Sequence, residues 1–175
     1  MKTNKPLAFI ALTAGLLTAG CGSLPKAADM TPAKIEVQNR SAKPVKVVVE
    51  GEPKVEKTVL VKNEELAKAI QMGIERSRLF SNVDKGTTEG FLLEVTIVGY
   101  NPPRSGFNMS ATMTTRWKLT RLPGEETVFE DFFKKTHTCT VGDAFAGMTR
   151  FRKTNEGVVR DTIAEGLQRI SATGL

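Results

Sequence analysis

Residues 107–119 alternate without a break between two kinds of side chain. One set is mainly apolar, and its members are Phe107, Met109, Ala111, Met113, Thr115, Trp117 and Leu119. The residues between them are polar or charged. Successive side chains of a β-strand point to opposite faces, so this period of two predicts a strand. One apolar and one polar face are typical of an antiparallel sheet that buries one side.

Other strands are predicted by the same alternation. Valines recur at every second position in residues 45–49, and apolar residues alternate with polar ones in residues 91–98. Residues 127–140 return as a further long strand after a turn at residues 122–125, and residues 55–61 add a short extended piece. β-branched and aromatic residues, which favour strands, are frequent in these segments.

Two amphipathic helices are predicted from apolar residues at helical spacing. Leu66, Ile70 and Ile74 form a stripe along residues 63–79, with Asn63 at the position of an N-cap. A second stripe predicts a helix over residues 155–170, and Asp143 is a candidate cap in the section before it. The second helix contains two glycines, which indicate that another element packs closely there. Its stripe and glycines are Val159, Ile163, Leu167, Ile170, Gly157 and Gly166.

The order of these segments is strand, helix, three antiparallel strands and helix. Two such helices bury their stripes on one face of a sheet. The predicted fold is α+β, a two-layer sandwich whose antiparallel sheet has about four to five strands with both helices on one face. The other face, rich in Thr, Ser, Lys and Arg, is free to stay wet or to meet a partner. Residues 35–175 are predicted to be this single domain.

The first 20 residues have the layout of a secretory signal. Lys2 and Lys5 precede an uncharged apolar run, residues 7–17, and three small residues follow it. As a helix, 11 residues rise only about 16 Å, whereas a bilayer core of about 30 Å needs about 20 residues. The run therefore predicts a cleaved signal and not a permanent span.

The sequence Thr18-Ala19-Gly20-Cys21 resembles the lipobox of bacterial lipoproteins, except that Thr18 stands where Leu is usual. The resemblance implies cleavage between Gly20 and Cys21 and the addition of acyl chains to Cys21. In enteric-type lipoproteins, Asp after the cysteine implies retention in the inner membrane. Gly22 at that position therefore implies the outer membrane, with the domain facing the periplasm. Residues 21–34, with two prolines and small residues, are predicted to be the lipidated cysteine and a flexible tether.

Two further segments resemble those of small envelope lipoproteins. They are AIQMGIERSRLFSNV, residues 69–83, and the closing segment from Asp143 to Ile170. In outline the chain also resembles the lipopolysaccharide-assembly and transport-auxiliary lipoproteins. No functional residue is carried over from this resemblance.

Catalytic and metal-binding patterns are sparse. His137 is the sole histidine, and it shares a predicted strand face with Cys139. No clear third group orients this pair, and a metal site needs three or four ligands. We therefore predict no catalytic residues, no metal, no cofactor and no enzymatic activity. The net charge of +6 falls to +4 without the two signal lysines. This modest positive charge does not indicate a nucleic-acid-binding protein.

Five basic residues are close in sequence to the junction between the sheet and the last helix: Lys134, Lys135, Arg150, Arg152 and Lys153. They are candidates for a patch that binds phosphates of lipid headgroups or lipopolysaccharide, and the alternative is a solvated basic rim. Four phenylalanines nearby are predicted to be core or staple residues, and the alternative is a stack that binds a ligand: Phe132, Phe133, Phe145 and Phe151.

The sequence thus predicts a non-enzymatic lipoprotein, held in the membrane by acyl chains on Cys21. Its expected partner is an envelope protein or glycolipid in an assembly or transport system. The alternative is a tethered module that binds a lipid or peptidoglycan fragment in a cleft between the helices and the sheet.

Overall fold

The structure is a computed structural model that describes residues 24–51, 54–55 and 58–175. The predicted signal peptide, its cleavage site after Gly20 and the candidate anchor Cys21 lie outside these residues. The elements are α1 (Ala27–Met30), β1 (Val45–Glu50), β2 (Lys54–Val55), β3 (Thr58–Val59), α2 (Asn63–Ser77), β4 (Gly90–Asn101), β5 (Met109–Leu122), β6 (Glu126–Cys139) and α3 (Gly147–Ser171).

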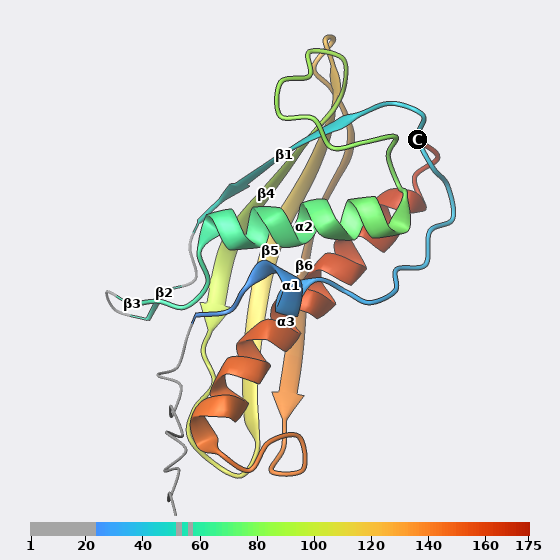
Figure 1. The fold of residues 1–175 in the computed structure, drawn as a ribbon. Helices are drawn as coiled ribbons and strands as arrows, with labels where there is room; N and C mark the ends of the chain where they lie inside the picture. The colour runs from blue at the N-terminus through green and yellow to red at the C-terminus, as the bar shows by residue number, and fades with distance from the viewer. Residues whose placement is uncertain (1–23, 52–53, 56–57) are drawn as a thin grey trace, which may run out of the picture.

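The strands β1, β4, β5 and β6 form one sheet in that order, and α2 and α3 cover one of its faces (Figure 1). The predicted two-layer α+β sandwich is confirmed. The sheet is mixed, however, because β1 runs parallel to β4, whereas β4–β5 and β5–β6 are antiparallel. The parallel pair is possible because the connection from β1 to β4 contains α2, which crosses over the sheet. The same connection contains the small β2–β3 hairpin.

From Met109 to Leu119 the alternation is the one that the sequence predicts, whereas Phe107, predicted on the same buried face, lies before β5 and is 85% exposed. Residues 109, 111, 113, 115, 117 and 119 are all buried against the helices. At the centre lies Trp117, fully buried, whose indole Nε1 donates a hydrogen bond to Thr115 Oγ1 at 3.0 Å. Its ring centroid is 5.9 Å from that of Phe133 on the neighbouring strand. The polar atom of the indole is therefore satisfied inside the apolar layer, as a buried tryptophan requires.

The two glycines of α3 bring the helix close to the sheet, as the sequence predicts. A Cβ at Gly166 would lie 2.7 Å from the ring of Trp117, and one at Gly157 would lie 2.1 Å from the ring of His137. Real Cβ atoms do not approach other atoms so closely. Glycine is therefore required where α3 crosses the two aromatic rings.

α3 starts earlier than predicted, and neither helix has the predicted cap. α3 begins at Gly147, eight residues before the predicted start, because residues 147–154 also place side chains in the buried layer, Arg150 and Thr154 among them. Asp143 does not cap α3, since its carboxylate accepts hydrogen bonds from the amide and hydroxyl of Thr140. Asn63 is the first residue of α2 and the N-cap is Lys62, which makes no side-chain capping bond.

The predicted tether is folded over much of its length. Residues 27–30 form α1 against α2 and α3, and Met30 is fully buried. The Ala27 amide donates to Glu65 Oε2 at 2.8 Å, and Arg160 Nη2 donates to the carbonyl of Asp29 at 2.8 Å. The hydrogen bond from the Ala27 amide is the main reason why the pKa of Glu65 lies below its ordinary value, and Lys68 lowers this pKa further. The folded part of the chain thus begins before Ile35, the predicted boundary.

Replacing Gly166 with alanine is expected to lower the free energy of unfolding by about 1–3 kcal/mol, because the new methyl group must displace Trp117 or α3. Urea denaturation followed by circular dichroism measures this change. Gly147→Ala is the matched control, because its Cβ would meet its nearest neighbour, Met109, at an ordinary 3.9 Å. Equal stability of the two variants would contradict the tight contact at Trp117.

Candidate binding surfaces

The five residues of the predicted basic patch do not come together. Lys134 is exposed on the face of the sheet that carries no helix, whereas its neighbour Lys135 points to the other face. There the Lys135 ammonium lies 3.0 Å from Glu165 Oε2 on α3. Arg169 and then Lys135 hold the pKa of Glu165 below its ordinary value. Lys135 is therefore part of the contact between helix and sheet.

Arg150 is a structural residue in this fold. It is buried, and its guanidinium donates to the carbonyls of Ala144, Phe145 and Gly106 at 2.9, 2.7 and 3.1 Å. The sequence gives no sign of this role, because the three acceptors are backbone atoms on two separate loops.

The last two members of the predicted patch are also engaged. Arg152 Nε lies 3.4 Å from Glu156 Oε1, and Lys153 donates to the carbonyl of Asp143 at 2.8 Å. The five basic residues thus divide among the helix-free face, the helix–sheet contact and the start of α3. They do not form one surface for an anionic partner.

His137 has the orienting group that the sequence did not reveal. Its Nδ1 lies 2.8 Å from Asp161 Oδ2 on α3, and its ring packs beneath Gly157. Cys139, two residues further along β6, is buried and free of disulfide bonds. The acid and the imidazole link β6 to α3, which accounts for both side chains by packing. Among the described residues no cluster of His, Cys, Asp and Glu is suited to hold a metal.

The four phenylalanines have different environments. Phe133 is buried and Phe151 is partly buried, in agreement with the prediction. Phe132 is 58% exposed and Phe145 is 90% exposed, so the prediction of a core position is wrong for these two. Phe132 lies on the helix-free face because residues 132 and 133 of a strand point in opposite directions.

The predicted cleft between the helices and the sheet is filled. Trp117, Ile163 and Leu167 are fully buried there in one continuous core with α2. This packing is that of a protein interior, which leaves no room for a ligand. Among the hollows on the surface of the described residues, one of about 740 Å³ lies at the end of α2.

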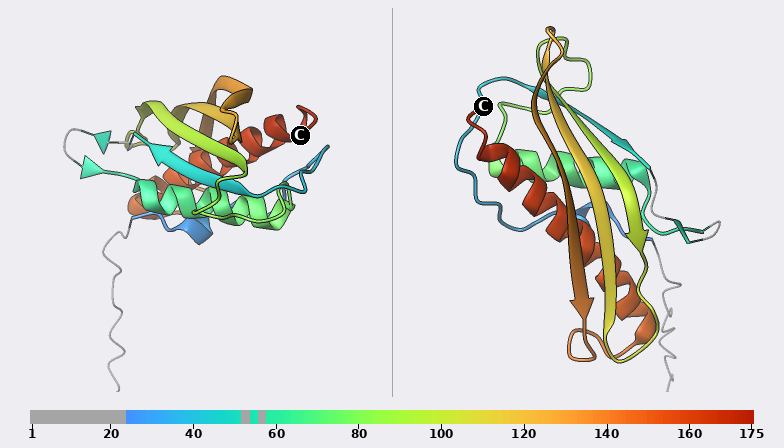
Figure 2. Two further views of the ribbon diagram at one scale, coloured as in Figure 1. Left: turned by 90° about the horizontal axis from the view of Figure 1, so that it is seen from above. Right: turned by 180° about the vertical axis from the view of Figure 1, so that it is seen from behind.

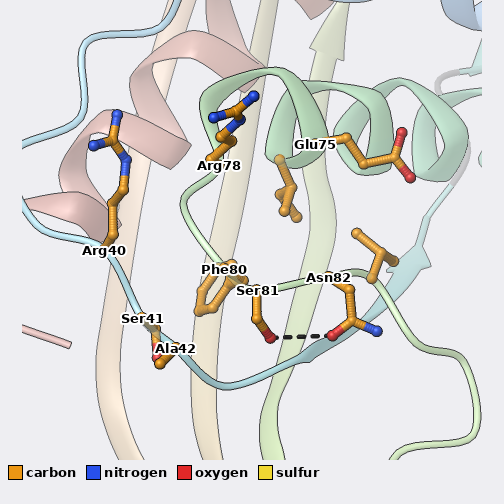
Figure 3. A pocket seen from close by; sticks show the side chains of 10 residues that line it. Arg40, Ser41, Ala42, Glu75, Arg78, Phe80, Ser81 and Asn82 are labelled. Atoms are coloured by element: carbon orange, nitrogen blue, oxygen red, sulfur yellow. Dashed lines mark hydrogen bonds between the residues drawn. The ribbon is translucent and has the colours of Figure 1, made fainter.

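This pocket is formed where the chain leaves α2 (Figure 3). Arg78 ends the helix with a positive φ of 54°, and the following residues pair with residues 41–45. The bonds include Ser41 N to Leu79 O at 2.8 Å and Ser81 N to Lys43 O at 3.1 Å. The lining residues are Arg40, Ser41, Ala42, Ile74, Glu75, Arg78, Phe80, Ser81, Asn82 and Val83.

Two exposed arginines give the pocket its chemistry. Figure 3 shows Arg40 and Arg78 directed to the same side of the hollow, with Glu75 further along α2. The C-terminus of a helix carries about half a negative charge, which opposes an anion here. The two positive charges exceed the negative charge of Glu75 and that half charge together, and guanidinium groups match phosphate and carboxylate. The sequence does not reveal this pair, because the arginines are 38 positions apart in the chain.

The helix-free face of the sheet is a second candidate surface, and it has the predicted composition. Cross-strand pairs order its polar side chains: Ser110 with Thr138 at 2.7 Å, Thr112 with Thr136 at 2.8 Å, and Arg116 with Glu130 at 2.7 Å. Such pairs fix side chains before any partner arrives.

Two large apolar side chains interrupt this polar face. Val98 is 51% exposed, and Phe132 is 58% exposed with the Arg116 guanidinium 5.8 Å from its ring centroid. A polar surface that carries ordered charges, an arginine and an exposed aromatic ring resembles the surfaces at which proteins bind one another.

Comparison with known proteins finds no matching family profile and no matching curated sequence. Among solved structures, the chain is similar to a Xanthomonas campestris protein of the family DUF330, with a TM-score of 0.62, 12% identity, and 86% of this chain and 93% of that chain covered. It is also similar to a hypothetical protein from Chlamydia trachomatis, with a TM-score of 0.53, 11% identity, and 75% of this chain and 96% of that chain covered. A minor lipoprotein from Acinetobacter baumannii is similar with a TM-score of 0.50, 11% identity, and 74% of this chain and 93% of that chain covered.

These likenesses concern the fold, since every identity is far below 25%. The chain has a fold that bacterial proteins use, a minor lipoprotein among them. The predicted resemblance to lipoproteins is confirmed for the fold alone. Fold alone does not fix what a protein binds.

The contact of Glu165 with Arg169 and Lys135 predicts a dependence of stability on pH. Because its pKa is lower in the folded chain, Glu165 stabilises the fold above the ordinary pKa of about 4.3 and loses this effect as pH falls through the folded value. Between pH 6 and pH 3, the free energy of unfolding of the Glu165→Gln variant is expected to fall less than that of the unchanged protein. The difference is less than about 1 kcal/mol, because the pair is partly exposed. Urea titrations at each pH measure it, and Glu64→Gln, exposed on α2, is the control.

Proposed function

We propose that the protein is a non-enzymatic lipoprotein of the bacterial envelope that binds a protein partner through the helix-free face of its sheet. Acyl chains on Cys21 hold it in the membrane, and Gly22 favours the outer membrane with the domain in the periplasm. Several acyl chains together give durable anchoring. The pattern of residues 1–21 and the fold shared with a lipoprotein support this proposal. None of the helices in the described part of the chain is long and apolar enough to cross a bilayer.

The proposal rests mainly on the side chains of the helix-free face, which cross-strand pairs hold in fixed positions. These pairs hold Arg116, Glu130 and Phe132 in place on strands of 14 residues each, so a partner meets a rigid surface. Rigid surfaces bind with a smaller loss of conformational entropy. The packing of His137 with Asp161 and of Cys139 in the core supports a role without catalysis.

A photoreactive amino acid at Thr114, on this face, is expected to capture one defined envelope protein in intact cells. Arg116→Glu should reduce the capture at least about tenfold, because it removes the pair with Glu130 and reverses a charge in the interface. Cys21→Ser should remove the acyl mass and release the chain from the membrane fraction. Mass spectrometry of the captured complex and of the mature N-terminus measures both effects.

Gln168, exposed on the outer side of α3, is the control position for the photoreactive group. Equal capture from Thr114 and Gln168 would contradict a specific interface. A mature chain without acyl groups would contradict the anchor. Hydrolysis of an ester or peptide by the purified protein would contradict the absence of enzymatic activity.

The pocket at the end of α2 favours a second candidate function, the binding of an anionic group such as the phosphate of an envelope glycolipid. Arg40 and Arg78 would bind the anion, with the Ser41 hydroxyl nearby as a donor, whereas the Ser81 hydroxyl donates to Asn82 Oδ1 at 3.1 Å. Core side chains fill the predicted cleft between the helices and the sheet. This pocket is therefore a better candidate than that cleft for binding a ligand.

Replacing Arg40 with alanine and Arg78 with asparagine is expected to weaken binding of a diphosphorylated glucosamine disaccharide by about tenfold or more, since each charge-assisted bond contributes about 1.5–3 kcal/mol. Asparagine tolerates the positive φ of residue 78. Isothermal titration calorimetry measures the affinity. Lys85→Ala removes an exposed charge outside the lining residues and serves as the control. The same loss in the control would assign the binding to net charge and not to the pocket.

A further inference from the structure

Three large apolar side chains are exposed together at one end of the molecule. Phe107 is 85% exposed, Phe145 is 90% exposed and Met148 is 70% exposed. They belong to the β4–β5 loop, the β6–α3 loop and the first turn of α3, which meet at the bottom of Figure 1. We call these three residues the apolar end. Single exposed apolar residues are common, but a group of large ones is typical of a binding surface.

The apolar end is held in shape by Arg150. This buried guanidinium donates to the carbonyl of Gly106 in one loop and to those of Ala144 and Phe145 in the other. The two loops that carry Phe107 and Phe145 are therefore fastened to each other and to α3. Their side chains are presented to solvent by a fixed backbone.

The start of the described chain lies beside this end. Leu24, 40% exposed, lines a hollow of about 180 Å³ together with Met148 and Phe151 of α3. Cys21 is three residues before Leu24 in the sequence. Consecutive Cα atoms are 3.8 Å apart, so the Cα of Cys21 lies within about 11 Å of that of Leu24. An acyl anchor on Cys21 is therefore confined to the neighbourhood of the apolar end.

The charges around the apolar end suit an anionic surface. Arg104 in the β4–β5 loop and Lys153 near the start of α3 are exposed basic side chains, and Asp143 is the exposed acidic one. Arg150 is buried against backbone carbonyls and Arg152 pairs with Glu156, so neither adds a free charge to this end. Basic residues beside exposed aromatic ones favour the interface of a membrane that contains anionic lipids.

We propose that the apolar end lies on the membrane, with Phe107, Phe145 and Met148 entering the headgroup region of the leaflet that holds the acyl chains of Cys21. This inference rests on the proposed anchor. It gives the domain one orientation, because the β5–β6 turn is at the opposite end of the sheet (Figure 2). A strand of 14 residues rises about 46 Å, so that turn and the far part of the helix-free face stand well away from the lipid.

The test uses the full mature chain, acylated in cells and reconstituted in vesicles of phosphatidylethanolamine and phosphatidylglycerol. An environment-sensitive dye is attached at Phe107→Cys or Phe145→Cys, and Glu125→Cys in the β5–β6 turn is the matched control. We expect a blue shift of the dye at the two apolar-end positions and quenching by nitroxide lipids there. The control dye should show neither. Phe107→Ser and Met148→Ser together should reduce the quenching of a dye at residue 145.

The outcomes separate this inference from the proposed function. An acylated chain whose dyes at residues 107 and 145 stay as exposed to water as the control overturns the inference alone. A mature chain that mass spectrometry shows to be without acyl groups overturns the anchor and the inference together. The dyes at residues 107 and 145 could be shielded from water only when a vesicle carries more than one chain. That result would assign the apolar end to contact with a second copy of the protein, and it would also overturn the inference.

Discussion

The close approach of α3 to the sheet is the constraint on which the rest of the fold depends. Gly166 sits directly over the ring of Trp117 and Gly157 over the ring of His137. This approach brings Asp161 to His137 and Glu165 to Lys135, so apolar contact and polar pairs join the same two layers. Both layers then extend past the core. α3 reaches the loops at one end of the sheet, where Arg150 fastens them.

The strands and helix stripes could be predicted because each depends on a short-range pattern. The alternation in residues 107–119 requires one buried face wherever the strand lies, and Leu66, Ile70 and Ile74 require one buried side of a helix. The parallel pairing of β1 and β4 could not be predicted in the same way, because it depends on where α2 crosses the sheet. The early start of α3 was missed since a buried arginine and threonine do not resemble an apolar stripe.

The candidate surfaces were harder to predict because each is assembled from distant segments. Arg40 and Arg78 meet only after residues 41–45 pair with the chain that follows α2. The predicted basic patch failed for the converse reason. Neighbours in sequence such as Lys134 and Lys135 are separated by the sheet, and Arg150 is used by backbone carbonyls. The polar face of the sheet was predictable, since it follows from the same alternation that identifies the core.

The packing of α1 changes what the N-terminal segment does. A free tether of 13 residues would let the domain sample a radius of about 20 Å around its anchor. With Met30 buried and Ala27 bonded to Glu65, most of that length is withdrawn into the fold. For a chain acylated at Cys21, only residues 21–26 would lie before α1. Under the proposed anchoring, the domain would stay close to the bilayer, which would raise the effective concentration of its surfaces for a partner in the same membrane.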